Sequence, residues 1–362
     1  MSEQGSKSPA VRTLKDLAAA LGVSRTTISN AFNRPDQLSA ELRDRILGSA
    51  QELGYPGPNP LARRLRTGRA GAIGVLFGDS LPYAFTDAAA ISFLRGVAQV
   101  CERHHAGMLI LPVVDEPAAG RMVREAAVDG FLTQFLPDGS PVIPWVLERR
   151  LPVVAVEQSK IPGVLAVNVD DFSGARAAAQ HLLDLGHRQF AILSLDLRPD
   201  GRRGRVSRSR LGRIEYPGTA RRLGGYQAAL REAGIDPGQV PVMECEGNNR
   251  ELARQATREL LASRAPPTAL LAMSDELAQG ALQAAQELAV PVPERLSVVG
   301  FDDAPGADCL QPPLTTVRQP LVEKGRVAAS LLLESSLDST PTEDRLLETE
   351  LIIRGSTASP PA

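Results

Sequence analysis

The sequence predicts a small all-α domain at the N-terminus, followed by an α/β core of two parallel-sheet subdomains. Its 362 residues exceed what one small domain needs. Capped helical segments fill residues 13 to 54. From about residue 71, apolar runs of strand length alternate with amphipathic helical stretches, which is typical of parallel sheets covered by helices.

The composition is that of a globular protein whose two ends differ in charge. Hydrophobic residues make up 43% of the chain, enough for a sizeable core. Residues 1–70 hold 11 Lys and Arg against 6 Asp and Glu, a net charge of +5, whereas the remainder carries −7. We therefore expect a polyanionic partner for the N-terminal end only. No apolar run reaches the length of a membrane span and the N-terminus shows no secretory signal, so we expect a cytoplasmic protein without membrane contact.

Capping signals predict three helices in the first domain. Thr13 with Asp16 forms a capping-box pattern at the start of the first helix. The later starts and the stops are marked by Ser24, Ser39, Gly22, Pro35 and Gly54. The first two helices are short and joined by a tight glycine turn, as in a helix-turn-helix.

The second helix combines an apolar face with many polar side chains. Ile28, Ala31 and Phe32 share the face that packs on the other helices. The remaining polar positions are Arg25, Thr26, Ser29, Asn30 and Asn33. Side chains with forked or bifunctional hydrogen bonding near a helix N-terminus recognise base edges in a major groove. A solvated helix face is the alternative, but the helix-turn-helix in a basic domain favours a recognition helix.

Residues 58–69, PNPLARRLRTGR, follow as a short basic segment. Asn59 and Pro60 suit a helix start, but the helix is too short to be stable alone. One interpretation is a charged linker. The other is a segment that folds on DNA, with arginines on phosphates and a leucine wedged into the minor groove.

The core is predicted to hold strands at AIGVLF, GMLILPV, DGFLTQF, LPVVAVEQ, LAVNV, FAILSL, VPVMECE, TALLAM, LSVVGFDD and ELIIRGST. These are too many for one compact sheet, so we expect two subdomains with a cleft between them. Ligands of such folds bind beyond the carboxyl ends of the strands.

Three segments, in order and spacing, resemble the LacI/GalR family of bacterial repressors: TLKDLAAALGVSRTTISNAFNRP, LSAELRDRILGSAQELGY and PNPLARRL. The resemblance implies a DNA-binding transcriptional regulator that acts as a repressor and has a periplasmic-binding-protein-like core. It implies a homodimer on a palindromic double-stranded operator. A small metabolite (a sugar, polyol, nucleoside or purine) would control it, with no cofactor and no catalytic residues. Only ASPPA follows ELIIRGST, so no tetramer-forming heptads are expected.

The resemblance also implies a division of the chain. A flexible tail (1–12) precedes the helix-turn-helix domain (13–58) and a hinge helix (59–70). The effector-binding and dimerisation core spans 71–362. Its first subdomain is about 71–168 with 319–343, and its second about 169–318 with 344–356.

On the DNA side, the resemblance assigns each position a role. Base-reading residues are Arg25, Thr26, Ser29 and Asn30. Backbone contacts are expected from Thr13, Ser24, Thr27, Asn33, Arg63 and Arg64. Leu65 would be the minor-groove lever, with Ala62 as its close-packed neighbour in the paired hinge helices.

On the effector side, Arg222, just before a predicted helix, and Asp302, at a strand end, match the family's effector-binding arginine and acid. An inter-element salt bridge is the alternative for each. Ser274 stands where sugar-binding members often carry Asn, which puts a hexose in doubt. Asp79 and Glu157 fall at pocket-mouth positions. Phe172 lies where purine-binding members place a stacking ring, although an ordinary core phenylalanine explains it equally well.

Other chemistries lack their motifs. The sequence has no dinucleotide fingerprint, HExxH, GxSxG or P-loop, and no metal site is proposed. An α/β enzyme or a solute-binding protein acting on a small hydroxylated metabolite remains the alternative class, but neither explains the basic helix-turn-helix. The Arg-rich segment 196–213 is interpreted as a flexible surface loop, with a second nucleic-acid contact as the alternative.

Overall fold

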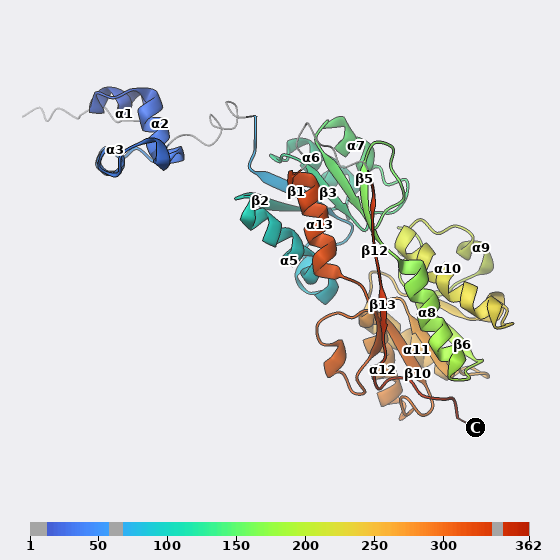
Figure 1. Cartoon of the computed structure of the whole chain (residues 1–362). Helices are drawn as coiled ribbons and strands as arrows, with labels where there is room; N and C mark the ends of the chain where they lie inside the picture. Colours follow the sequence, from blue (N-terminus) through green and yellow to red (C-terminus); the bar gives the residue numbers. More distant parts are fainter. Residues whose placement is uncertain (1–12, 58–67, 335–342, 362) are drawn as a thin grey trace, which may run out of the picture. The chain divides into compact units, whose positions relative to one another are not determined.

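The computed structural model describes residues 13–57, 68–334 and 343–361. The chain divides into two compact units, Met1–Ala70 and Gly71–Ala362 (Figure 1). The first is helical and the second is α/β, which confirms the predicted fold class.

The first unit contains three helices within its described residues: α1 (Leu14–Leu21), α2 (Arg25–Asn33) and α3 (Ala40–Glu52), with a 3-10 turn, η1, at Pro35–Gln37. The predicted capping box of Thr13 and Asp16 is formed, and Gly22 ends α1 with a left-handed φ of 66°. The hydroxyls of Ser24 and Ser39 cap α2 and α3. One small core joins the helices: Leu17, Ala18, Ile28, Ala31, Ile46, Ala50 and Tyr55.

The first sheet of the second unit has the strand order β12-β5-β4-β3-β1-β2, and all neighbours pair in parallel. Its strands are β1 (Ala72–Phe77), β2 (Gly107–Pro112), β3 (Phe131–Gln134), β4 (Val153–Val156), β5 (Leu165–Val169) and β12 (Arg345–Leu347). Helices α5 (Ala88–Arg103) and α13 (Leu321–Glu334) pack on one face. Helices α6 (Glu116–Glu125) and α7 (Val142–Glu148) pack on the other. The 3-10 turn η2 (Tyr83–Phe85) precedes α5.

The second sheet has the order β13-β11-β10-β9-β6-β8-β7. Its strands are β6 (Phe190–Ser194), β7 (Gly204–Arg205), β8 (Val242–Glu244), β9 (Ala269–Ala272), β10 (Ser297–Asp302), β11 (Thr315–Arg318) and β13 (Glu350–Ile352). The two edge strands, β7 and β13, pair antiparallel and the others in parallel. Its helices are α8 (Asp171–Asp184), α9 (Arg208–Leu211), α10 (Pro217–Glu232), α11 (Arg250–Leu261) and α12 (Asp275–Glu287), with 3-10 turns η3 (Pro237–Gln239) and η4 (Ala307–Cys309).

The last passage between the sheets differs from the prediction. The resemblance places all of residues 344–356 in the second subdomain, but β12 pairs with β5 of the first sheet, and only β13 joins the second. The two strands follow one another from sheet to sheet (Figure 1). β12 is a largely exposed edge strand of three residues, so its sequence carries no burial pattern that would have assigned it.

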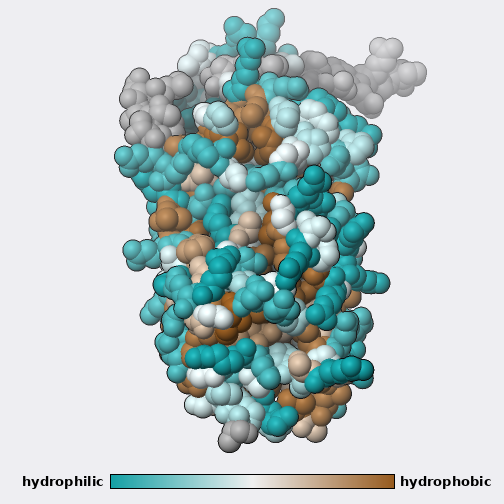
Figure 2. Space-filling view, turned by 90° about the vertical axis from the view of Figure 1, so that its right-hand side faces the viewer, coloured by the Kyte–Doolittle hydropathy of each residue, from teal (hydrophilic) through white to brown (hydrophobic). Residues whose placement is uncertain are grey.

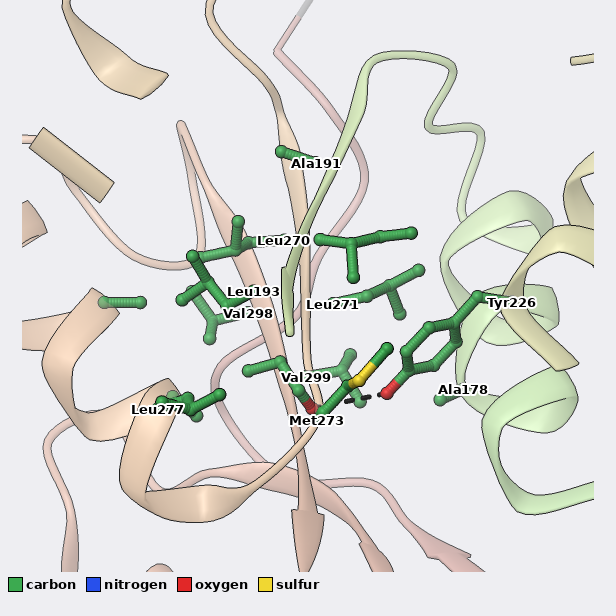
Figure 3. Packing of buried hydrophobic residues seen from close by; sticks show 14 of the residues in the cluster. Ala178, Ala191, Leu193, Tyr226, Leu270, Leu271, Met273, Leu277, Val298 and Val299 are labelled. Carbon is green, nitrogen blue, oxygen red and sulfur yellow. Dashed lines mark hydrogen bonds between the residues drawn. The ribbon is translucent and has the colours of Figure 1, made fainter. Parts of the chain in front are cut away.

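The core of the second sheet includes the largest fully buried aromatic side chain, Tyr226 of α10 (Figure 3). Its ring packs among aliphatic residues of the central strands, and its hydroxyl donates a hydrogen bond to the Ala272 carbonyl at 3.3 Å. This bond satisfies the one polar atom of a ring that is otherwise in apolar surroundings.

Helices α5 and α13 approach so closely that their contact requires glycine. A Cβ at Gly96 would lie 2.0 Å from the Val322 carbonyl oxygen, and one at Gly325 would lie 2.1 Å from that of Phe93. The backbones are therefore in direct contact at this crossing, which fixes α13 on the first sheet.

The segment 196–213 is more ordered than the predicted flexible loop. It contains β7, which pairs with β8, and the short helix α9. Arg210 anchors it through paired hydrogen bonds to Glu244 (2.6 and 2.8 Å) and to Asp200 (both 2.7 Å). The sequence alone does not reveal this order, because Glu244, the partner of Arg210, lies 34 residues away.

The surface that carries α9 and α10 is mostly hydrophilic, with apolar side chains in small separate groups (Figure 2). None of the helices in the described ranges combines the length and the apolar character needed to cross a lipid bilayer.

Candidate functional site

The start of α2 presents the residues predicted to read bases. Arg25 and Thr26 are exposed, whereas Ser29 and Asn30 are half-buried. Ser24 and Thr27 serve the helix start, because Ser24 Oγ accepts the Thr27 N–H and lies 2.8 Å from Thr27 Oγ1. The first turn therefore offers a charged fork and a hydroxyl to a partner, on a helix whose beginning is firmly capped.

Other predicted DNA contacts are already engaged or lie outside the described residues. The Asn33 amide donates a hydrogen bond to the Ser29 carbonyl at 2.9 Å, and Thr13 caps α1. Ala62, Arg63, Arg64 and Leu65 fall in residues 58–67, outside the described ranges. The hinge assignment thus stays a prediction.

The second unit contains a cavity of about 90 Å³ between its two sheets. One water molecule needs roughly 10–15 Å³ by this measure, so the cavity has room for a small organic molecule. Its walls come from both subdomains, at or near the carboxyl ends of strands. The polar lining consists of Asp79, Tyr83, Asp87, Gln134, Glu157, Asp196, Arg222, Asn248, Ser274, Asp302, Gln319 and Lys324.

Arg222 is buried and held on several sides. Its Nε donates to Asp171 at 2.8 Å, Nη1 donates to the Met273 carbonyl, and Asp302 lies 3.7 Å from Nη1. The guanidinium carbon lies 3.8 Å from the centre of the Phe301 ring. Burial lowers the pKa of Arg222, but Asp171, Asp302 and Glu157 raise it more, so the side chain remains charged.

The position of Arg222 in the helix differs from the prediction. It lies in the second turn of α10, which begins at Pro217, and not before the helix. Gly224 and Gly225 stand inside this helix, where it touches α8. A Cβ at Gly225 would lie 2.3 Å from the Phe172 carbonyl oxygen.

Asp302 ends β10 in an unusual backbone conformation, with φ of 123°. This strained geometry is typical of functional positions. Its Oδ1 accepts a hydrogen bond from Gln319 Nε2 at 2.6 Å. Burial raises the pKa of Asp302, more than Arg222 lowers it. The adjacent Asp303 pairs with Arg318 and Arg354 and does not line the cavity.

A buried chain of polar contacts connects Asp302 to the first sheet. Gln319 Oε1 accepts from Lys324 Nζ at 2.8 Å, and Lys324 Nζ lies 2.7 Å from Glu157 Oε1. Burial raises the pKa of Glu157, but the opposing effect of Lys324 and Arg222 is larger, so the pKa is lowered overall. Since Glu157 directly follows β4 of the first sheet and Asp302 ends β10 of the second sheet, these contacts couple the two subdomains.

A second connection crosses at Asn248, which follows β8. Its Nδ2 donates to Tyr83 Oη at 2.8 Å and to Asp87 at 3.3 Å, both in the first subdomain. Its Oδ1 accepts from the Ser274 hydroxyl at the start of α12. Asn248 therefore places a side-chain amide in the cavity lining next to Ser274. Ser274 is the position at which sugar-binding members of the family often carry Asn.

Five of the six predicted effector residues line this one cavity: Asp79, Glu157, Arg222, Ser274 and Asp302. Phe172 does not. It is 43% exposed at the start of α8, with its ring against Gly224.

Several lining residues escaped the sequence interpretation: Tyr83, Asp87, Gln134, Asp196, Asn248, Gln319 and Lys324. Asp196 could have been found, because it follows the predicted strand FAILSL directly. Lys324 could not, because a lysine on an amphipathic helix is ordinarily solvent-exposed.

Comparisons with known proteins match regulatory proteins over nearly the whole chain. Residues 13–59 match the model described as bacterial regulatory proteins, lacI family, and residues 179–357 match the periplasmic binding protein-like domain. The HTH-type transcriptional regulator Rv3575c of Mycobacterium tuberculosis is 42% identical over 97% of this chain and 98% of its own length.

Two similar solved structures also span both units. The complex of the transcriptional regulator CelR with cellobiose is 27% identical with a TM-score of 0.69, covering 95% of this chain and 99% of that one. The Lac repressor dimer bound to operator and the anti-inducer ONPF is 25% identical with a TM-score of 0.77, covering 96% and 99%. The similarity therefore covers the helical unit as well as the α/β unit.

Proposed function

The chain belongs to the LacI family of bacterial DNA-binding transcriptional regulators, and from this we propose that it is a repressor controlled by a small metabolite in the cavity between its subdomains. As a family member it is a regulator and not an enzyme. The proposal adds the direction of regulation, the palindromic operator, the homodimer and the residues responsible.

On the DNA side, Arg25, Thr26, Ser29 and Asn30 are proposed to contact bases. The exposed first turn of α2 supports this, because a guanidinium fork matches the paired acceptors of guanine. Thr13, Ser24, Thr27, Asn33, Arg63 and Arg64 are proposed for the DNA backbone. Ala62 and Leu65 are proposed for the minor groove. The Lac repressor is a relative whose dimer was solved bound to operator.

On the effector side, the observation that carries the proposal is that both subdomains line one cavity with charged and polar groups. Glu157 and Asp79 come from the first, and Arg222, Ser274 and Asp302 from the second. A ligand that contacts both favours one relative orientation of the subdomains, which is what a two-state coupling to DNA requires. CelR with cellobiose is a relative with a small carbohydrate bound.

A homodimer fits the apolar surface around β2 and α5. Phe85, Ile91 and Leu109 are large hydrophobic residues that are exposed in the single chain. Leu109 lies on β2, an edge strand whose free side could meet another copy. Light scattering at micromolar concentration should give a dimer, and a stable monomer with and without operator would exclude it.

The experiment for the whole proposal combines selection and ligand screening. Random-sequence duplexes should yield a palindromic operator when selected on the full chain. A thermal-shift screen of sugars, polyols, nucleosides and purines should then find a compound that raises the melting temperature. If that compound leaves operator affinity unchanged, the proposed control is wrong.

A further inference from the structure

Gln134 presents a buried hydrogen-bond acceptor to the effector cavity. Its Nε2 donates to Glu157 Oε2 at 2.9 Å, which orients the amide because a carboxylate only accepts. Its Oε1 is buried and has no partner in the part of the chain that the structure describes. A buried acceptor left without a donor is costly, so this atom calls for a donor from a bound molecule.

Three cavity carboxylates also lack a cationic partner. Asp79, Asp87 and Asp196 make no ion pair with any described residue. Each accepts a backbone N–H, from Ser80, Ala90 and Gly247 respectively. Burial raises the pKa of Asp196 to about 6, so this carboxyl is still largely ionised at pH 7. Ionised carboxylates only accept hydrogen bonds.

The two cations of the lining are already paired with carboxylates of the protein. Lys324 Nζ is shared between Glu157 and Gln319, at 2.7 and 2.8 Å. Arg222 is paired with Asp171 and lies near Asp302. The lining therefore holds five carboxyl groups, at Asp79, Asp87, Glu157, Asp196 and Asp302, against these two cations.

We propose that the cavity accepts a hydroxyl-rich ligand without an anionic group and rejects the phosphorylated and carboxylated forms of such compounds. This rests on the proposed function, because it takes the cavity to be the regulatory site. A ligand hydroxyl can rotate its O–H toward any of these acceptors. A phosphate, in contrast, would meet further negative charge, and both cations of the lining are already paired. The acceptors lie in both subdomains, with Gln134 and Asp79 in the first and Asp196 in the second. One ligand with hydroxyls on opposite sides can therefore bridge them.

The test uses paired probes on the full chain: ribose with ribose 5-phosphate, glucitol with glucitol 6-phosphate, and glucose with gluconate. Thermal shift and calorimetry measure binding of each. The neutral member of a pair should raise the melting temperature, and its anionic partner should bind at least tenfold more weakly. An anionic member that binds as tightly as its neutral partner overturns the proposal.

Variants assign the effect to the named groups. Asp196→Asn keeps the shape of the side chain and removes its charge. It should reduce the ratio of the anionic to the neutral probe's Kd by at least tenfold. Gln134→Leu should weaken neutral binding by at least tenfold, with circular dichroism as the check on folding. Glu259→Gln, an exposed carboxylate on α11 that does not line the cavity, is the matched control and should change neither. An unchanged preference in Asp196→Asn also overturns the proposal.

Operator binding separates this inference from the proposed function. An anionic probe that binds and changes operator affinity would leave the function standing and remove the inference. A neutral probe that binds selectively without changing operator affinity would leave the inference standing and remove the proposed function.

Discussion

Replacing Lys324 with Met should destabilise the second unit, because the buried Glu157 carboxylate would lose its ion-pair partner. Lys324 and Glu157 are 2.7 Å apart, with side chains 2% and 7% exposed. At an effective dielectric constant of about 20, their attraction is about 6 kcal/mol. Desolvation offsets part of this, and removal of one partner of such buried pairs costs about 3–5 kcal/mol. We expect a loss of that size in the free energy of unfolding at pH 7.

The loss should depend on pH in a defined direction. In the wild type the pKa of Glu157 is depressed below its ordinary 4.5, so its contribution is present above pH 4.5 and disappears as the pH falls through the folded value. In Lys324→Met the dominant remaining influence is burial, which raises that pKa. The free energy of unfolding of the variant should therefore fall furthest below that of the wild type at pH 7. The difference should shrink as the pH falls toward 4.5.

Urea unfolding followed by circular dichroism at several pH values measures both effects. The matched control is Lys160→Met, which removes an exposed pair with Asp344 at 2.6 Å and should cost at most about 1 kcal/mol. Adding Glu157→Gln to Lys324→Met should restore part of the stability. A loss below 1 kcal/mol, or one that is the same at every pH, would refute this account of the buried chain.

Three further predictions concern the DNA-binding segment and the helix crossing. Arg25→Ala should cost roughly 1–3 kcal/mol at one operator position, measured by competition between operator variants, and identical profiles for both proteins would remove Arg25 from the base-reading set. Leu65→Ala should reduce DNA bending and the preference for operator over random DNA while phosphate binding survives, and an unchanged bend in gel-shift assays would make residues 58–69 a mere linker. Gly96→Ala should cost at least about 1–3 kcal/mol, because its Cβ would lie 2.0 Å from a carbonyl oxygen of α13. A wild-type melting temperature for Gly96→Ala would contradict the close approach of α5 and α13.

Local signals in the sequence explain how far the fold could be predicted. Side chains at Thr13, Ser24 and Ser39 act on the backbone within three residues, so the three helices of the first unit followed from the sequence. Most strands of the core followed from buried apolar runs. The short edge strand β12 has neither signal, and its place in the first sheet depends on pairing with β5 about 180 residues earlier.

Arg222 lies within a helix, and only the resemblance to the family indicated it. The other predicted residues that line the cavity stand at or just after strand ends. Asp302 and Glu157 were found in this way, and Asp196 could have been. Gln134 and Lys324 could not, since their roles arise from contacts with residues 23 and 167 positions away. Such contacts depend on the packing of the sheets and leave no spacing in the sequence.

The central claim is that a ligand in the cavity controls DNA binding, and fluorescence anisotropy tests it most directly. The operator is the duplex enriched by selection, and the ligand is the compound that raises the melting temperature. Saturating ligand should change the operator Kd of the wild type by at least tenfold, and that of Asp302→Asn by much less. An operator Kd that is the same with and without bound ligand in the wild type would contradict the claim.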